Sequence, residues 1–395
     1  MPAVIYIFTL CAFAIGFTEF ISIGLASALA ESLQVSLARV SLAVTLYATG
    51  VVIGAPVLTA LAAGWPRKRL LLVAMLAFTA GNILAALSTH LTLLLMARLL
   101  TGLAHGVFFA VASSVATRLV TADRAGIALS LVFGGVTVAM TLGVPAGTWL
   151  GSVLPWQWIF ALIAICGLIG TVGLARWMPV GAGDIANEIS GWRQLHVLFD
   201  RHLLAGACLP LLSYTGSFAF YTFITPILLR ITQTDIRGAS IILLAYGIGA
   251  AIGNIVGGRM TDRIGMDRAS LLLLTGIVVV LTLIGLGQGS FFFMIVLVMA
   301  LGLTTYGAIP PLQARILGLA QRHRPQALDV ASGLNIAAFN AGVVAGSILG
   351  ATSLKYWGLN SLAWIGLIVA LLALLMLGWQ RHQPSMQFSS ARKMD

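Results

Sequence analysis

The sequence predicts an all-α membrane protein with twelve transmembrane helices in two pseudo-symmetric six-helix halves. The first reason is composition: 59% of the 395 residues are hydrophobic and 8% are charged, against roughly 45–50% and 25% in soluble globular proteins. The second reason is a series of long apolar segments, which give the chain a mean hydropathy of +1.03. The third reason is an internal repeat. Together these observations exclude a soluble globular class.

Each apolar segment is long enough to cross a bilayer, because about 20 apolar residues span the ~30 Å hydrocarbon core. The high glycine content, 43 of 395 residues, suits helices that approach closely within lipid. The twelve predicted helices are residues 4–26, 40–62, 70–88, 91–113, 126–150, 157–177, 203–228, 239–258, 269–287, 291–312, 330–353 and 361–380.

The repeat appears when the sequence is laid on itself with an offset of 199 residues. Residues 143–151 then fall on residues 342–350, with six of nine positions identical. The offset aligns the second predicted helix with the eighth and the fifth with the eleventh. The predicted organisation is an N-terminal half, a cytoplasmic linker, a C-terminal half and a cytoplasmic tail, at residues 1–177, 178–202, 203–380 and 381–395.

The basic residues predict the topology. Most Lys and Arg residues lie in the tail and in the loops that follow even-numbered helices, whereas the opposite loops hold only Arg39, Arg230, Arg237 and Lys355. The positive-inside rule therefore places both termini in the cytoplasm. The net charge of +11 reflects this topology, so we expect no nucleic-acid partner. The three cysteines lie in apolar runs without the spacing of a metal site.

Small residues recur at intervals of four in the second, fifth, eighth and eleventh predicted helices. Spacing of four puts each set on one helix face, where another backbone can approach. We expect the second, fifth, eighth and eleventh helices to form the seam along which the two halves move. The sets are Gly50 and Gly54; Gly143, Gly147 and Gly151; Gly249, Gly253 and Gly257; and Gly342, Gly346 and Gly350.

Glu19 is the one ionisable residue in the first predicted helix. A carboxylate in the hydrocarbon core costs a few kcal/mol unless it is protonated, paired or hydrated, and such residues commonly mark a proton, ion or substrate pathway. A structural ion pair, or a side chain that extends outward to the interface, is the alternative. Arg98 in the fourth helix lies at the same predicted depth, since each residue is seven positions from the outer end of its helix. The two side chains can therefore meet.

Several motifs resemble those of the major facilitator superfamily, and within it the bacterial drug:proton antiporters near the sugar and arabinose efflux branch. GFTEFISIGL at residues 16–25 resembles the acidic motif of the first helix, and RLLTGLAHGVFF at 98–109 resembles the Arg motif of the fourth. GVTVAMTLGVPAG at 135–147 is similar to the antiporter motif of the fifth helix, with its Pro displaced by one place. The resemblance covers nearly the whole chain and implies a multi-pass protein of the bacterial inner membrane.

The loop motif of this family occurs in two copies that differ. GRMTDRIG at residues 258–265 resembles it, whereas LAAGWPRKRL at 61–70 has Ala63 and Gly64 in place of the Asp and Arg of the family. We expect Asp262, beside Arg263, to act as a conformational lock through a helix N-terminus or a basic side chain. A solvated loop is the alternative. The departure at Ala63 puts a symmetric pair of locks in doubt.

The resemblance also implies that the first, fourth, seventh and tenth helices line a central cavity, with Glu19 and Arg98 in proton coupling. His105 and Phe109 share one helix face with Arg98, so His105 is a third candidate, although a structural histidine is the alternative. At the 199 offset Glu19 falls on Phe218 and Arg98 on Leu297, so the proton chemistry is confined to the first half.

Aromatic and amide side chains are the candidates for substrate binding, although each alone could serve packing. A cavity with such walls suits a moderately hydrophobic or hydroxylated small molecule. The candidates are Tyr47, Phe109, Phe218, Tyr221, Thr225, Tyr246, Tyr306, Asn335 and Phe339, with Tyr214 and Asn254 beside them.

These patterns predict a secondary transporter that exports a small organic molecule in exchange for protons. We expect a monomer in the lipid bilayer that needs no cofactor, since the proton gradient supplies the energy and no nucleotide motif occurs. A proton symporter or facilitator that takes up a sugar or nucleoside is the first alternative, because fold does not fix direction. A membrane enzyme or a receptor is the second, but no nucleophile or metal motif is apparent.

Overall fold

The computed structural model describes residues 1–35, 37–40, 42–143, 146–147, 150, 153–181 and 195–383. Within these ranges the chain is helical and contains no strand. Twelve helical segments are long and apolar enough to cross a membrane, which confirms the predicted all-α fold. The central part of the predicted linker 178–202, most of the tail 381–395 and Pro145 of the antiporter-like motif lie outside the described residues.

Contacts divide the chain into two units, which are described separately. The first unit comprises Met1–Thr121, Leu131–Phe199 and Pro325–Ala337. The second unit comprises Ala122–Ser130, Asp200–Arg324 and Ala338–Asp395. Two helices therefore contribute to both units: α8 (Ala125–Val138), which continues as the π-helical turn η3 (Ala139–Gly143), and α18 (Leu328–Trp357).

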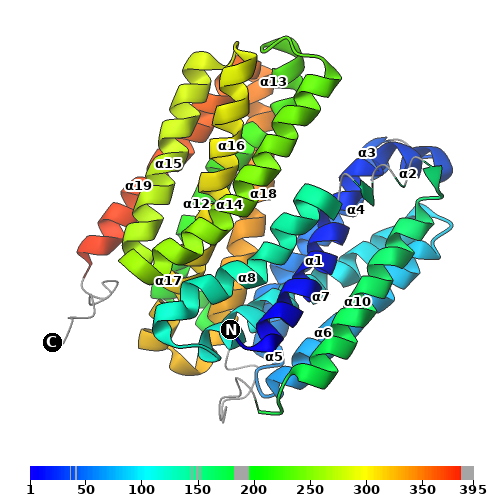
Figure 1. Ribbon diagram of the computed structural model, residues 1–395, viewed down its shortest axis with the longest axis vertical. Helices are drawn as coiled ribbons and strands as arrows, with labels where there is room; N and C mark the ends of the chain where they lie inside the picture. Colours follow the sequence, from blue (N-terminus) through cyan, green and yellow to red (C-terminus); the bar gives the residue numbers. More distant parts are fainter. Residues whose placement is uncertain are drawn as a thin grey trace. The chain divides into compact units, whose positions relative to one another are not determined.

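The first unit is organised around one long helix (Figure 1). This helix, α7, packs against α4 and α6, and α6 packs against α10, which also contacts α1. The main helices are α1 (Ala3–Gly24), α4 (Leu42–Ile53), α6 (Arg67–Ala86), α7 (Leu91–Arg118) and α10 (Gln157–Trp177); the shorter elements are α2 (Ala26–Ser32), α3 (Leu37–Val40), η1 (Gly54–Leu58), α5 (Thr59–Leu61), η4 (Leu195–Phe199) and η5 (Pro325–Ala327).

The π-helical turn η1 interrupts the second span at Pro56. A proline has no N–H to donate to the preceding turn, and its ring crowds the carbonyl four residues earlier, so a wider turn fits it better. The span then resumes as α5.

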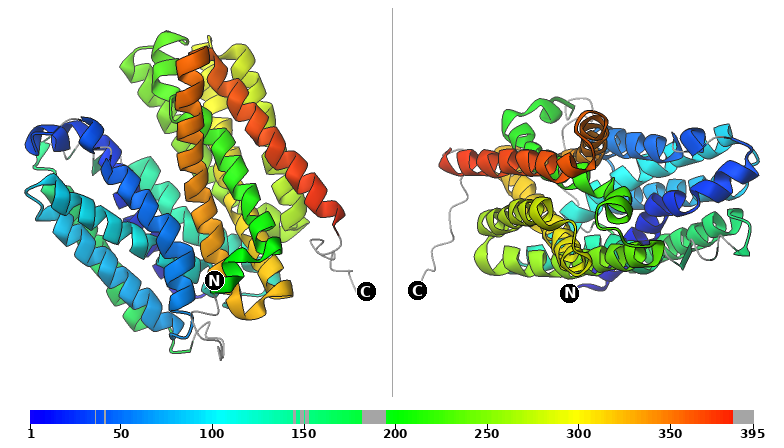
Figure 2. Two further views of the ribbon diagram at one scale, coloured as in Figure 1. Left: turned by 180° about the vertical axis from the view of Figure 1, so that it is seen from behind. Right: turned by 90° about the horizontal axis from the view of Figure 1, so that it is seen from above.

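The second unit has the same organisation, with α14 packed against α16 and α12 against α19. The helices of each unit run side by side in the two further views of Figure 2. Its elements are η2 (Ala122–Arg124), α12 (Arg201–Tyr221), α13 (Ile224–Arg230), α14 (Ile236–Ile264), α15 (Met266–Gly287), α16 (Phe291–Gly307), α17 (Ile309–His323), η6 (Leu359–Ser361) and α19 (Leu362–His382).

The tenth span extends beyond its predicted end at residue 312. α16 ends at Gly307, and α17 begins at Ile309 and continues to His323. Pro310 and Pro311 lie in the first turn of α17, where the missing N–H groups need no partner within the helix. The sequence showed the apolar part of this span but not its polar continuation.

The described ladder glycines pack against helices of their own unit, and the seam between the halves stays a prediction. An added Cβ on Gly54 of the first unit would overlap the backbone of Leu103 on α7. Gly253 of the second unit meets Leu303 on α16 in the same way. Gly342 and Gly346 face the backbone of α12, also within the second unit. The matching contacts of the two units support the internal repeat.

Candidate functional site

Arg98 is anchored inside the first unit by groups on two other helices. Its side chain on α7 is 1% exposed. Its Nη1 donates to the backbone oxygen of Thr18 at 2.9 Å and to the Thr18 hydroxyl at 3.1 Å, and its Nε donates to the Ala43 oxygen at 3.4 Å. The Thr18 hydroxyl in turn donates to Oδ1 of Asn82 at 2.7 Å. The guanidinium is thereby fixed against α1 and α4.

Glu19 lies next to Thr18 on α1 and interacts electrostatically with Arg98. Among the described residues it forms no ion pair within 4.0 Å, so Arg98 and Glu19 are near each other but not in salt-bridge contact. Nη2 of Arg98 is buried and has no hydrogen-bond partner in the described part of the chain. An anchored guanidinium with one free donor can therefore bind a further acceptor, such as the Glu19 carboxylate or a substrate oxygen.

Tyr47 connects Arg98 to His105. The guanidinium carbon of Arg98 lies 4.2 Å from the centre of the Tyr47 ring, and the Tyr47 hydroxyl lies 2.7 Å from Nδ1 of His105. The His105 ring packs 4.9 Å from that of Phe109, which stacks on Phe133 at 5.3 Å. The structure thus brings the three predicted proton-coupling residues into one group and places Tyr47, a predicted substrate residue, between two of them.

Six aromatic residues of the second unit form one connected cluster on α12, α14, α16 and α18. Tyr221 stacks on Tyr246 with ring centres 3.9 Å apart, and Tyr214 contacts Phe339 at 4.7 Å. The Tyr246 hydroxyl is buried and has no hydrogen-bond partner among the described residues. The cluster contains Tyr214, Phe218, Tyr221, Tyr246, Tyr306 and Phe339.

Two predicted substrate residues, Thr225 and Asn335, are not part of this set of ring contacts. α12 ends at Tyr221, and the exposed Thr225 belongs to the next helix, α13, beyond a break at Thr222 and Phe223. Asn335 is buried, but its segment of α18 belongs to the first unit.

Asp262 caps the start of α8 within the second unit. Its carboxylate accepts hydrogen bonds from the backbone N–H groups of Gly126 at 2.6 Å and of Ile127 at 2.9 Å. A carboxylate at a helix N-terminus is stabilised by the unpaired N–H groups and by the helix dipole. Arg263 is exposed and takes no part in these bonds. The carboxylate therefore uses a helix N-terminus, one of the two modes that the sequence allowed.

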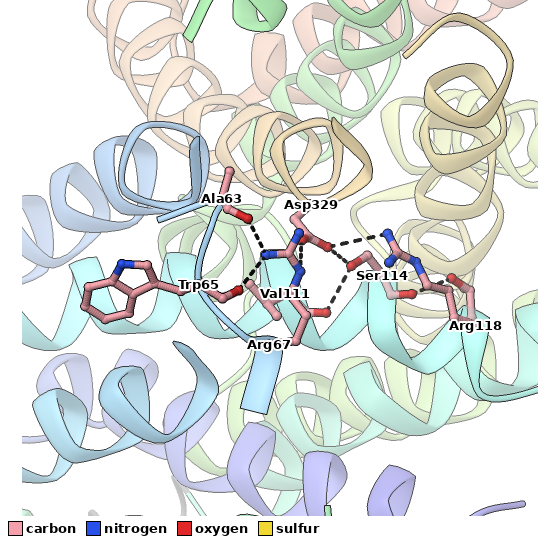
Figure 3. A network of polar contacts seen from close by, with 8 residues as sticks. Ala63, Trp65, Arg67, Val111, Ser114, Arg118 and Asp329 are labelled. Atoms are coloured by element: carbon pink, nitrogen blue, oxygen red, sulfur yellow. Dashed lines mark hydrogen bonds and ion pairs between the residues drawn. The ribbon is translucent and has the colours of Figure 1, made fainter. Parts of the chain in front are cut away.

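Asp329 forms a second buried network, which sequence reasoning missed (Figure 3). Its carboxylate on α18 lies 2.5 Å from Nε of Arg67, accepts a hydrogen bond from the Ser114 hydroxyl and lies 4.0 Å from Nη2 of Arg118. Arg67 and Asp329 are each only 3% exposed. Nη1 of Arg67 also donates to the backbone oxygen of Ala63 at 2.9 Å.

The carboxylate of each network comes from a different kind of element. In the second unit the acid is in the loop motif and binds the start of α8, whereas in the first unit the loop position is Ala63 and the acid comes from the first turn of α18. The absence of an acid at Ala63 was the signal that could have prompted a search for another one nearby in space.

Thr18→Val should lower the free energy of unfolding by about 1–3 kcal/mol, because Asn82 Oδ1 loses its donor and Arg98 loses one acceptor. The midpoint of thermal unfolding in detergent measures this loss. Thr282→Val is the matched control, since among the described residues the Thr282 hydroxyl donates to the Val278 oxygen of its own helix and to no other helix. Equal shifts in both variants would contradict the role assigned to Thr18.

Comparisons with known proteins agree with this architecture. The chain is 34% identical over 385 residues to the inner membrane transport protein YdhP of Escherichia coli (strain K12), with 97% of this chain and 94% of that protein covered. It is 31% identical to a probable sugar efflux transporter of Helicobacter acinonychis (strain Sheeba), with 94% and 93% covered. It is 34% identical over 267 residues to a chloramphenicol resistance protein of Streptomyces lividans, with 67% and 68% covered.

A solved structure shares the fold at low sequence identity. The crystal structure of the human organic anion transporter MFSD10 superposes with a TM-score of 0.76 and 15% identity, covering 95% of this chain and all of that one. The family model of the Major Facilitator Superfamily matches residues 8–210 and 206–393. Nearly the whole sequence is thus accounted for, and the chain belongs to the major facilitator superfamily of membrane transporters.

Proposed function

We propose that this transporter exports a small organic molecule in exchange for protons and that Glu19 carries the proton. The observation that supports this most directly is the buried Arg98, held by Thr18 and Ala43 with one nitrogen free, within electrostatic range of an unpaired Glu19. Burial disfavours a charged carboxylate, whereas a nearby guanidinium favours it, so a small change in the surroundings can load or release the proton. Tyr47 and His105 are the other titratable groups beside this pair.

The second unit supports binding of an uncharged, partly aromatic or hydroxylated substrate. Its six-ring cluster offers faces for stacking, and the free Tyr246 hydroxyl offers one hydrogen bond. Two relatives carry names that refer to sugar efflux and to chloramphenicol resistance, and both substrate types fit this description. We expect the protein to act as a monomer in a bacterial cytoplasmic membrane, with both termini in the cytoplasm.

Purified protein in vesicles tests the coupling. With chloramphenicol or a neutral sugar outside, an antiporter should accumulate the solute when the vesicle interior is the more acidic side, and solute entry should make protons leave. A symporter would require the opposite gradient, and a facilitator would show no dependence on either gradient. Accumulation with an acidic exterior only would overturn the proposal in favour of uptake.

Asp262→Asn should slow transport and shift the population of conformations toward the inward-open state, while substrate binding persists. The variant keeps the side chain's size but removes the negative charge at the start of α8, a loss of about 0.3–1 kcal/mol. Initial transport rates at equal protein amounts measure the effect. Arg263→Gln is the control, because this neighbour is exposed and outside the cap. An unchanged rate in Asp262→Asn would rule out a lock at this position.

A further inference from the structure

An apolar groove opens on the surface of the first unit, away from the Arg98 group. It has a volume of 340 Å³ and is lined by residues of the second, third and fourth spans, among them Leu61, Trp65, Val73, Ala77, Leu103 and Val107. Every lining residue is apolar. Leu61 and Val73 are 38% and 43% exposed although they belong to membrane-spanning helices, so the groove faces a nonpolar environment.

One end of the groove is marked by Trp65 and Arg69, between α5 and α6. Trp65 is 42% exposed, and the guanidinium carbon of Arg69 lies 4.9 Å from the centre of its ring. Tryptophan is enriched at the membrane–water boundary, where an apolar body and a polar edge are both accommodated. The predicted topology places this end at the cytoplasmic face.

The neighbouring cations are already engaged. Arg67 pairs with Asp329, and the Lys68 ammonium donates to the backbone oxygens of Ala175 at 2.8 Å and Met178 at 2.6 Å. Arg69 is exposed, and within the described ranges its recorded contact is the Trp65 ring. Stacking occupies the face of the guanidinium and leaves its N–H edge able to bind a phosphate through two hydrogen bonds.

We propose that this groove binds one anionic phospholipid of the inner leaflet, with an acyl chain along the groove and the phosphate on Arg69. The groove's volume of 340 Å³ is within the range of about 300–1,000 Å³ of ligand sites, and its apolar lining suits an acyl chain. The inner leaflet carries the anionic lipids that basic side chains attract at its surface. The apolar lining and the exposed Arg69, which stacks on the lining residue Trp65, match the two parts of such a molecule.

The test uses delipidated full-length protein in detergent with phosphatidylglycerol or phosphatidylethanolamine of identical acyl chains, and native mass spectrometry measures the bound fraction. Wild type should retain phosphatidylglycerol preferentially. Arg69→Gln should lower the affinity for phosphatidylglycerol about fivefold and leave phosphatidylethanolamine unchanged. Val73→Trp should lower retention of both lipids, because the indole fills the groove from its exposed side.

Arg268→Gln is the matched control. Arg268 is exposed and occupies the position of Arg69 at the 199 offset, but Ile264 stands there in place of Trp65. Equal losses in the Arg69 and Arg268 variants would show diffuse surface attraction and overturn the site. Unchanged retention of both lipids in Val73→Trp would show that the acyl chain does not bind in the groove. Displacement of the lipid by transported solute would show that the groove binds substrate instead. Thermal unfolding of each variant confirms that it is folded.

Discussion

Glu19→Gln should abolish export driven by a pH gradient while the purified protein still binds its substrate. The amide has nearly the shape of the protonated acid but cannot release a proton, so one step of the exchange cycle is lost. Reconstituted variant protein should therefore show no accumulation against a gradient and no proton movement on addition of solute. Counterflow of labelled against unlabelled solute should remain, because it needs no net proton transfer.

The pH dependence of binding provides a second readout for Glu19. If substrate binds better when Glu19 is ionised, binding expels the proton, and linkage requires that the proton weakens substrate binding by the same factor. The affinity of wild type should rise with pH until Glu19 is ionised in the free protein and then level off. In Glu19→Gln the profile should be flat. In this proposal the proton and the substrate compete without direct contact, because the ionised Glu19 and the substrate both interact with the Arg98 guanidinium.

Glu31→Gln is the control for this experiment, because Glu31 is an exposed carboxylate beyond the end of α1. Glu31→Gln should accumulate solute and move protons across the vesicle membrane as wild type does. If Glu19→Gln moved protons normally, or kept the wild-type pH profile, Glu19 would be a structural residue. His105 would then be the next candidate, since Tyr47 joins it to the Arg98 group.

The sequence predicted the spans, and the position of Tyr214 and Phe218 on one helix face, because both depend on local pattern. The contacts among rings of four different helices depend on the fold. Apolar length fixes which segments can cross lipid, and ring positions along one helix place Tyr214 and Phe218 together. The break after Tyr221 has a sequence signal in Pro226, which has no N–H for the Thr222 carbonyl and lies in the first turn of α13.

The polar partners were harder to predict because they come from distant parts of the chain. Counting residues from the helix ends placed Arg98 at the same membrane depth as Glu19. The atoms that bind the guanidinium are those of Thr18 and Ala43, however, and no motif marks these residues. Asp329 escaped notice because it precedes the predicted start of its helix by one residue, where an acid looks like an ordinary loop residue. Only the fold shows that it lies against Arg67.

We propose that Asp329, like Asp262, acts as a conformational lock, and Asp329→Asn should lower the stability more than Asp262→Asn does. Removing one partner of a buried pair leaves the other charge uncompensated, at a cost of about 3–5 kcal/mol, and Arg67 is only 3% exposed. We expect a lower midpoint of thermal unfolding together with slower transport. Arg118→Gln should change the thermal midpoint and the transport rate by little. Arg118 is partly exposed and lies 4.0 Å from the Asp329 carboxylate, and such pairs contribute about 0–1 kcal/mol.

A second-site change separates a lock from simple loss of stability. Ala63→Asp places a carboxylate where the second unit has Asp262, next to the backbone oxygen that already accepts from Arg67. In the Asp329→Asn background this carboxylate can pair with Arg67 again, so the thermal midpoint should recover. Transport should stay impaired, because the new pair lies within the loop and α6 and no longer involves α18. Recovery of both properties would show that only the charge of Arg67 needs neutralising, and it would contradict a lock formed by Asp329.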